Sequence, residues 1–87
     1  MQWRLSYGRF GLTRQILQEM YDSQGGVCAI CLGDGASKMG LVLDHDHKTN
    51  KARALLCHNC NVGLGNFKDD PALLESAERY LKKYKKL

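Results

Sequence analysis

The stretch that decides the fold runs from Leu41 to Asn61 and reads LVLDHDHKTNKARALLCHNCN. It holds two short apolar runs on either side of a polar turn, and the second run ends in a Cys-x-x-Cys pair followed directly by asparagine. This order predicts an antiparallel hairpin and then a helix anchored by cysteine. Carboxylate, imidazole and carboxamide groups gather where the hairpin and the helix would meet, so we expect this unit to carry the chemistry of the chain.

The four cysteines form two Cys-x-x-Cys pairs separated by 25 residues, Cys28 and Cys31 followed by Cys57 and Cys60. Such pairs are typical of a tetrahedral zinc site made of four thiolates. Four thiolates fill the coordination sphere, so we expect this zinc to be structural and to take no part in a reaction. A disulfide within one pair would close too short a loop to stabilise the chain much. A cross-paired disulfide framework in a secreted chain is the alternative.

Length and charge narrow the class of protein. The 87 residues predict a single domain over 1–87. A domain of this size is only marginally stable from the burial of apolar side chains, so we expect a further stabilising feature such as a bound metal. No signal peptide or apolar run of membrane-spanning length is present, so we expect a soluble cytoplasmic protein with no membrane contact. The net charge of +4 is only weak support for nucleic acid as a binding partner. The basic residues nevertheless gather near the start, around the hairpin turn and at the end of the chain.

Helical patterns flank the central unit. A helix is predicted over residues 13–24, with Thr13 as its N-cap and a Gly-Gly pair after its end. Another is predicted from Asp70 to the end of the chain, with Pro71 in its first turn and an apolar stripe along one side. The first twelve residues mix aromatic with basic side chains, which suits docking on the core as well as contact with nucleic acid. These residues are Trp3, Arg4, Tyr7, Arg9 and Phe10.

The run Asp44-His45-Asp46-His47 and the later Asn61 supply oxygen and imidazole groups. Aspartate and asparagine oxygens can hold a hard cation such as Mg²⁺ while leaving positions for water and phosphate. A neutral imidazole beside that ion could accept a proton from an attacking water near pH 7, so the set suits phosphodiester hydrolysis. The alternative is a polar strand end whose residues cap a turn or add zinc ligands.

Strand geometry sets a condition on this site. Successive residues of a regular strand point to opposite faces, which would separate Asp44 from His45. We therefore expect the strand to end, twist or bulge near Asp44 if the two side chains share one site.

At these residues the chain resembles a known family. Asp-His-Asp-His, followed by a basic residue and Leu-Leu-Cys-x-x-Cys-Asn, is similar to the recombination endonuclease VII family of HNH nucleases. Tyr7-Gly8, Gly11-Leu12-Thr13, the run QGGVCAIC that starts at Gln24 and the closing Asp-Asp-Pro…Ala…Tyr-Leu segment also fit. The resemblance thus covers roughly residues 7 to 84.

The resemblance implies a small zinc-stabilised α+β domain in which a ββα-metal (HNH, or His-Me finger) motif is flanked by N- and C-terminal helices. It implies a phage-encoded or phage-derived, magnesium-dependent DNA endonuclease in which Mn²⁺ can replace Mg²⁺. Asp44 and Asn61 would bind the magnesium ion, with His45 as the general base and His47 assisting at the scissile phosphate. The four cysteines would hold zinc. Three basic residues are expected to contact DNA: Lys48, Lys51 and Arg53.

We expect a monomer or weak dimer in the cytoplasm of a bacterial host, with DNA as its partner and larger phage or host proteins as recruiters. A rival function from another class is a non-catalytic, zinc-bound module that binds nucleic acid or acts as an adaptor. That module would keep the cysteines and the basic surface but use Asp44, His45 and Asn61 as ordinary polar residues. Plasmid nicking in Mg²⁺ compared with EDTA separates the two functions.

Overall fold

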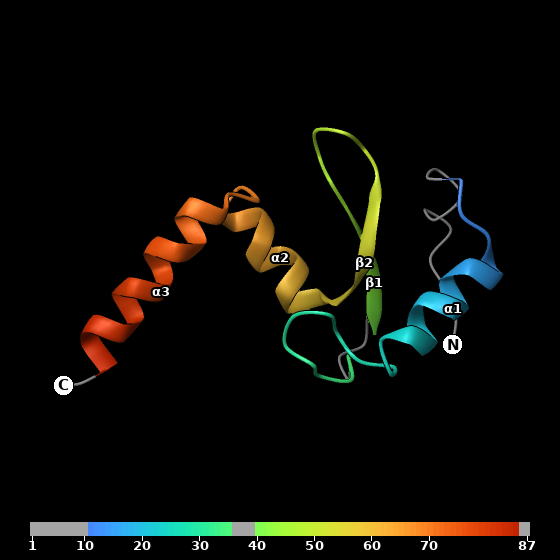
Figure 1. Cartoon of the computed structure of the whole chain (residues 1–87), viewed down its shortest axis with the longest axis horizontal. Coiled ribbons are helices and arrows are strands. Elements are labelled where there is room, and N and C mark those ends of the chain that lie inside the picture. Colours follow the sequence, from blue (N-terminus) through green and yellow to red (C-terminus); the bar gives the residue numbers. More distant parts are fainter. Residues whose placement is uncertain (1–10, 36–39, 86–87) are drawn as a thin grey trace.

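A computed structural model of the chain describes residues 11–35 and 40–85. These residues form three helices and one antiparallel sheet of two strands. The elements, in chain order, are α1 (Arg14–Ser23), β1 (Leu41–His45), β2 (Ala52–Cys57), α2 (His58–Asn66) and α3 (Pro71–Lys85). The predicted α+β class, with a ββα unit between N- and C-terminal helices, is confirmed (Figure 1). The aromatic and basic residues expected to dock or bind near the start lie outside the described residues.

Helix α1 begins and ends as its sequence predicts. Thr13 is the N-cap, and its Oγ1 accepts a hydrogen bond from the backbone N–H of Ile16 at 3.1 Å. The helix gives way to Gly25 and Gly26, which adopt φ values of +69° and +74° that only glycine takes without cost. Leu17 is the buried residue of this helix, and it anchors α1 to the core.

The hairpin has one irregularity, and it falls at Asp44. Leu43 pairs with Leu55, but two residues further along β1 His45 pairs with Ala52. Two residues of β2 therefore stand opposite the single residue Asp44, which is the pattern of a β-bulge. The interruption of the strand that the sequence argument required near Asp44 is thus present.

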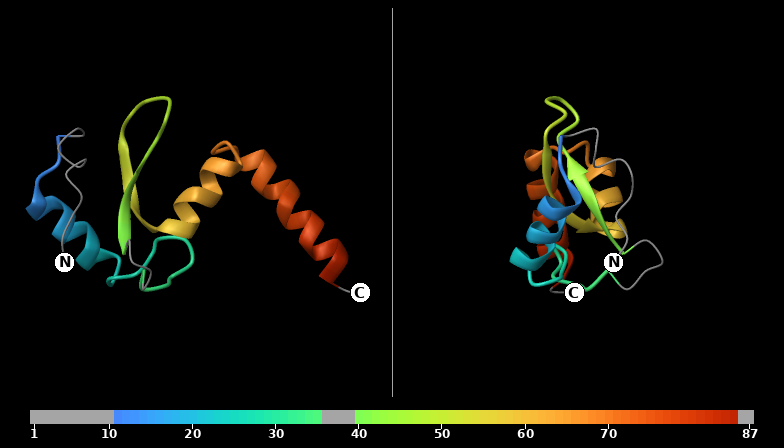
Figure 2. Two further views of the ribbon diagram at one scale, coloured as in Figure 1. Left: turned by 180° about the vertical axis from the view of Figure 1, so that it is seen from behind. Right: turned by 90° about the vertical axis from the view of Figure 1, so that its right-hand side faces the viewer.

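The hairpin lies between α1 and α2, in Figure 1 and from behind in Figure 2. Helix α1 contacts β2, whereas α2 contacts both strands. Leu55 and Leu56 are neighbours on β2 and are both buried. Because neighbouring strand residues point to opposite faces, both faces of the sheet are covered. The core is small, and its buried members are Leu17, Cys28, Leu41, Leu55 and Leu56.

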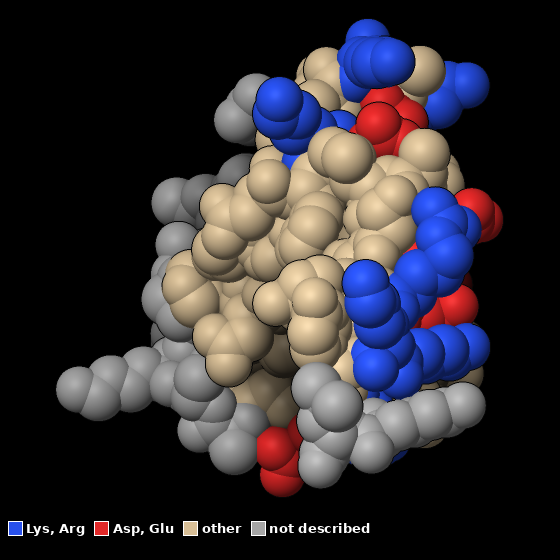
Figure 3. Space-filling view, turned by 90° about the vertical axis from the view of Figure 1, so that its left-hand side faces the viewer, with Lys and Arg blue, Asp and Glu red and all other residues tan. Residues whose placement is uncertain are grey.

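Helix α3 extends away from this core (Figure 1) and contributes no buried residue among those described. Its predicted apolar stripe is present but exposed, since Leu81, for example, keeps 64% of its surface accessible. The predicted cap is also present, because Asp70 Oδ1 accepts a hydrogen bond from the N–H of Ala72 at 2.9 Å. Seen from the end of the molecule at which α3 lies, lysine and arginine side chains lie along the right-hand edge and at the top of a surface made mostly of uncharged residues (Figure 3). None of the helices in the described ranges has the length and apolar character needed to cross a membrane.

Candidate functional site

The two Cys-x-x-Cys pairs meet in one cluster. The four Sγ atoms lie within 4.8 Å of one another, and those of Cys31 and Cys57 are 3.7 Å apart. With zinc–sulfur bonds of about 2.3 Å, the edge of a thiolate tetrahedron is about 3.8 Å, so the cluster fits a tetrahedral zinc ion. All four cysteines are free thiols, which disagrees with the disulfide alternative. The predicted metal-binding cluster is confirmed, and a structural zinc is the ion that its ligands suit.

Backbone N–H groups point at the sulfurs. The amides of Ile30, Gly33 and Cys60 donate to Cys28, Cys31 and Cys57, each at 3.4 Å. Burial alone would raise the pKa of Cys28, but hydrogen bonds from the backbone of Cys31, Cys57 and Ile30 outweigh it and lower that pKa to about 6. Burial and the neighbouring sulfurs raise the pKa of Cys60 to about 12. The fold therefore favours a thiolate at Cys28 before any ion binds.

The bulge turns Asp44 into the protein. This side chain is the buried charged group of the described residues, with a residue exposure of 6%. Its Oδ2 accepts a short hydrogen bond from Nε of Arg53 at 2.6 Å. Within the described ranges its Oδ1 has no hydrogen-bond partner. A buried carboxylate with one oxygen held and the other open is suited to bind a cation.

Arg53 also reaches a second acid. Its Nη2 lies 3.4 Å from Oδ2 of Asp69, which follows α2. The hydrogen bond and the charge of Asp44, together with the charge of Asp69, raise the pKa of Arg53 above its ordinary value. The predicted contact of Arg53 with DNA stays a prediction, and the structure adds that this guanidinium is already paired with two carboxylates.

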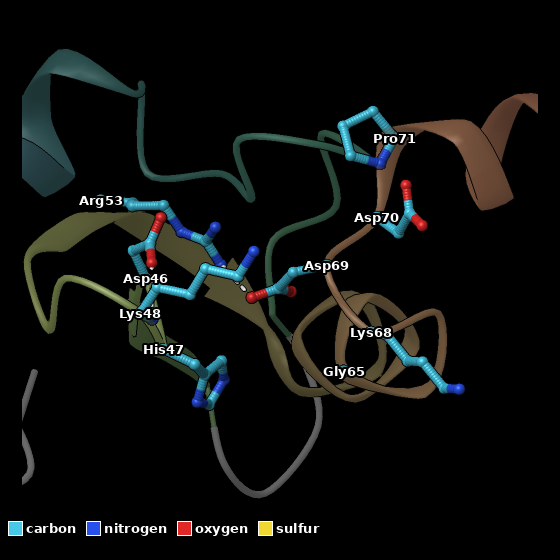
Figure 4. A pocket seen from close by; sticks show the side chains of 9 residues that line it. All are labelled: Asp46, His47, Lys48, Arg53, Gly65, Lys68, Asp69, Asp70 and Pro71. Carbon is cyan, nitrogen blue, oxygen red and sulfur yellow. Dashed lines mark hydrogen bonds and ion pairs between the residues drawn. The ribbon is translucent and has the colours of Figure 1, made fainter.

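A cavity of about 690 Å³ opens beside these ion pairs, between the hairpin turn and the turn that joins α2 to α3. Figure 4 shows Lys48 and Arg53 on the hairpin side and the carboxylate of Asp69 facing Arg53. His47 is exposed and lines this cavity, and its ring lies 4.6 Å from the ring of His45. The structure thus brings His45, His47 and Lys48 to the same end of the hairpin. The residues that line the cavity are Asp46, His47, Lys48, Arg53, Gly65, Lys68, Asp69, Asp70 and Pro71.

The hairpin turn is ordered by Asp46, which takes the turn-capping role that the alternative interpretation offered for the Asp44–His47 run. Its Oδ1 accepts hydrogen bonds from the backbone N–H groups of Lys48 at 2.7 Å and Thr49 at 3.1 Å. The bonds from Thr49 and Lys48 hold the pKa of this carboxyl below its usual range. The turn presents Lys48 and Lys51 to solvent, where both could meet a phosphate backbone.

Asn61 lies on α2, one residue after the zinc-ligand position Cys60, and it is half-buried. Helix α2 contacts both strands, and Asn61 lies in its first turn, next to the Cys57 end of β2. Its joint role with Asp44 as a metal ligand stays a prediction.

Sequence reasoning missed two polar contacts between distant segments. Gln24, treated only as the end of α1, accepts from the N–H of Leu55 at 3.0 Å and donates to its C=O at 2.9 Å. Asp69 was not singled out, yet it holds Arg53. The Asp-Asp-Pro run was used only for the family resemblance and for the start of the last helix, and no local signal names the partner of a side chain 16 or 31 residues away.

Comparison with known proteins gives a consistent picture. The sequence profile of the family described as "Recombination endonuclease VII" matches residues 2–83. The "Gene 59 protein" of Mycobacterium phage D29 is 40% identical over 75 residues, covering 85% of this chain and 46% of that protein. The protein of the same name from Mycobacterium phage L5 is 40% identical over 73 residues, covering 83% and 44%.

A solved structure extends the comparison to the fold. The β-β-α-Me type II restriction endonuclease Hpy99I superposes with a TM-score of 0.59 and 39% identity, over 84% of this chain and 43% of that chain. This chain spans less than half the length of each of the three proteins. The family match over residues 2–83 includes the hairpin, α2 and the cysteine cluster.

Proposed function

The chain belongs to the recombination endonuclease VII family, and from that membership we propose that it is a metal-dependent DNA endonuclease of the HNH type. The observation that carries the proposal is the buried Asp44, set in a β-bulge beside His45, in a ββα unit similar to that of a β-β-α-Me restriction endonuclease. Its substrate is a phosphodiester bond of DNA. Nicking and double-strand cleavage both fall within this class.

The donor set suits a hard divalent cation. The carboxylate of Asp44 and the carboxamide oxygen of Asn61 are the ligand types that Mg²⁺ prefers, and Mn²⁺ accepts the same ligands. When bound there, the ion would offset the charge that develops on the scissile phosphate. Zinc would stay with the four thiolates, because soft sulfur ligands fill its coordination sphere and leave no open position.

The other steps fall to side chains of the chain itself. His45 accepts the proton of the attacking water, since imidazole is the side chain suited to that transfer near pH 7. The water oxygen forms a bond to phosphorus as the bond from phosphorus to the 3′ oxygen breaks, and the leaving 3′ oxygen takes up a proton from water. His47, whose ring lies 4.6 Å from that of His45, assists at the phosphate. Lys48 and Lys51 hold the DNA backbone at the hairpin turn. A protein that is a monomer or weak dimer, recruited by larger phage or host proteins in the bacterial cytoplasm, fits this proposal.

A plasmid-nicking assay tests the proposal. Zinc-loaded protein is mixed with supercoiled plasmid in Mg²⁺, in Mn²⁺ or in EDTA, and its zinc content is measured before and after. We expect nicks with Mg²⁺ or Mn²⁺ only. His45→Ala should lower the rate by about 10²- to 10⁴-fold, as expected for loss of a general base, without lowering the zinc content.

His58→Ala is the matched control, because His58 is an exposed histidine at the start of α2, outside the proposed site. It should cleave like the wild type. Absence of cleavage by zinc-loaded wild type in both ions would favour the non-catalytic nucleic-acid-binding module. Full activity of His45→Ala would remove His45 from the mechanism.

A further inference from the structure

Arg53 stands between two carboxylates that belong to different elements. Its Nε donates to Asp44 on β1, and its Nη2 contacts Asp69 in the turn between α2 and α3. A guanidinium is planar, and its N–H groups have fixed directions, so one side chain can hold both acids in a defined geometry. Arg53 therefore connects the strand that carries Asp44 to the far end of the helix that carries Asn61.

The position of Asp69 is itself firmly set. Lys68 and Asp69 adopt φ values of +58° and +55°, a left-handed conformation that side chains rarely take. Backbone hydrogen bonds hold this turn, from Lys68 N–H to Gly65 C=O and from Asp69 N–H to Leu64 C=O, both at 2.9 Å. Unfavourable backbone conformations persist where the surrounding structure enforces them, and they are frequent at functional sites. Here the turn brings the carboxylate of Asp69 to Arg53 (Figure 4).

We propose that Arg53 is a positioning residue for Asp44, and that Asp69 anchors Arg53 for this task. The inference rests on the proposed function, because it concerns the metal ligand Asp44. Arg53 engages Oδ2 of that carboxylate and leaves Oδ1, which has no hydrogen-bond partner in the described ranges, for the ion. Metal-binding carboxylates are commonly held by such a further hydrogen bond, and its loss lowers metal affinity. Asp69 balances the charge that Arg53 brings close to the site.

The test measures Mn²⁺ affinity without any turnover. Zinc-loaded full chain is titrated with Mn²⁺, and the free ion is followed by electron paramagnetic resonance. Arg53→Met should weaken Mn²⁺ binding by about 10- to 100-fold, the range for loss of such a supporting contact. Arg53→Lys should not restore it, because one ammonium group cannot hold both carboxylates. Asp69→Asn should weaken binding less than Arg53→Met does, since the contact with Asp44 remains.

Two matched controls separate positioning from charge. Lys68→Met removes the same charge from the lining of the same cavity, and Asp70→Asn neutralises a neighbouring acid while keeping a capping side chain. Neither side chain contacts Asp44 in the described ranges. Lys68→Met should therefore weaken Mn²⁺ binding less than Arg53→Met does, and Asp70→Asn should weaken it less than Asp69→Asn does. Zinc content and helicity show that each variant is folded. If Arg53→Met fails this check, Asp69→Asn compared with Asp70→Asn decides the matter.

The outcomes differ for the two proposals. Equal or tighter Mn²⁺ binding in folded Arg53→Met would overturn the positioning role, and tighter binding would indicate that Arg53 competes with the ion for Asp44. Rescue by Arg53→Lys would reduce the role to charge alone and overturn it as well. Absence of Mn²⁺ binding by the wild type would overturn the metal assignment of the proposed function, and this inference with it.

Discussion

Replacing Gln24 by alanine should destabilise the fold far more than its place at a helix end suggests. Its carboxamide pairs with the backbone of Leu55 as a neighbouring strand would, with Oε1 accepting from the N–H at 3.0 Å and Nε2 donating to the C=O at 2.9 Å. Nε2 also donates to the C=O of Val27 at 2.8 Å. Leu55 is fully buried, so water cannot easily replace these contacts.

The magnitude follows from what Gln24→Ala leaves behind. The C=O of Leu55 still accepts a hydrogen bond from the N–H of Ala29 at 3.2 Å, but the N–H of Leu55 no longer has Oε1 of Gln24 as its acceptor. A buried donor left without a partner costs about 1–3 kcal/mol, so we expect the free energy of unfolding to fall by about 2 kcal/mol. For a domain of this size that corresponds to a drop of about 8–16 °C in the melting temperature.

The assay is thermal and urea unfolding followed by circular dichroism. Free zinc must be buffered at one concentration throughout, because a bound ion raises apparent stability by mass action. Gln18→Ala is the matched control, since Gln18 lies on α1 and its side chain makes, among the described residues, a single exposed hydrogen bond to Asp22. It should change stability by less than about 0.5 kcal/mol. A Gln24→Ala protein as stable as Gln18→Ala would show that this pairing does not hold α1 to the sheet.

Three further predictions concern the core, the cysteine cluster and an exposed leucine. Leu17→Ala should cost about 2–5 kcal/mol, because this side chain is 1% exposed, whereas Leu81→Ala, at a residue 64% exposed, should cost less than about 0.5 kcal/mol in the same unfolding assay. In the zinc-free fold the lowered pKa of Cys28 favours a thiolate above about pH 6, so its contribution to stability is lost as the pH falls through that value. Calorimetry in buffers of different ionisation enthalpy counts the protons released on zinc binding, and the count should be about one higher below pH 6 than at pH 7, because Cys28 then binds zinc from its thiol form; an unchanged proton count across pH 6 would contradict this. Leu32→Gly should stabilise the protein by up to about 1 kcal/mol, because Leu32 is exposed and has a φ of +62°, and a loss of stability would contradict that reasoning.

The sequence predicted the parts whose signals are local. Cysteine spacing identified the metal cluster, and the caps of α1 and α3 lie at Thr13 and Asp70 as their side chains indicated. The bulge at Asp44 followed from a simple conflict, since regular alternation would have separated Asp44 from His45. Each of these features depends on residues that are close in the chain or on a spacing that is typical of one kind of site.

The parts that could not be predicted depend on distant partners. An apolar stripe predicts that a helix has a face to bury but does not say against what, and the stripe of α3 is exposed among the described residues. Arg53 was assigned to DNA from its charge alone, because the two acids that pair with it become its neighbours only through the bulge and the turn at residues 68 and 69. A basic residue in a sequence indicates an interaction with some negatively charged group, and the fold determines which such group lies beside it.

The thiolate cluster and Asp44 are connected to opposite ends of β2. Arg53, which holds Asp44, is near the start of this strand, and Cys57 is its last residue. At about 3.4 Å per residue Arg53 and Cys57 are about 14 Å apart, too far for the thiolate-bound ion to act on a phosphate beside Asp44. The cluster can still affect the site through α2, because Cys60 and Asn61 are neighbours on its first turn. A loss of cleavage in EDTA would therefore fit two causes, removal of zinc from the thiolates or removal of the ion proposed at Asp44, and a titration in which zinc is retained separates them.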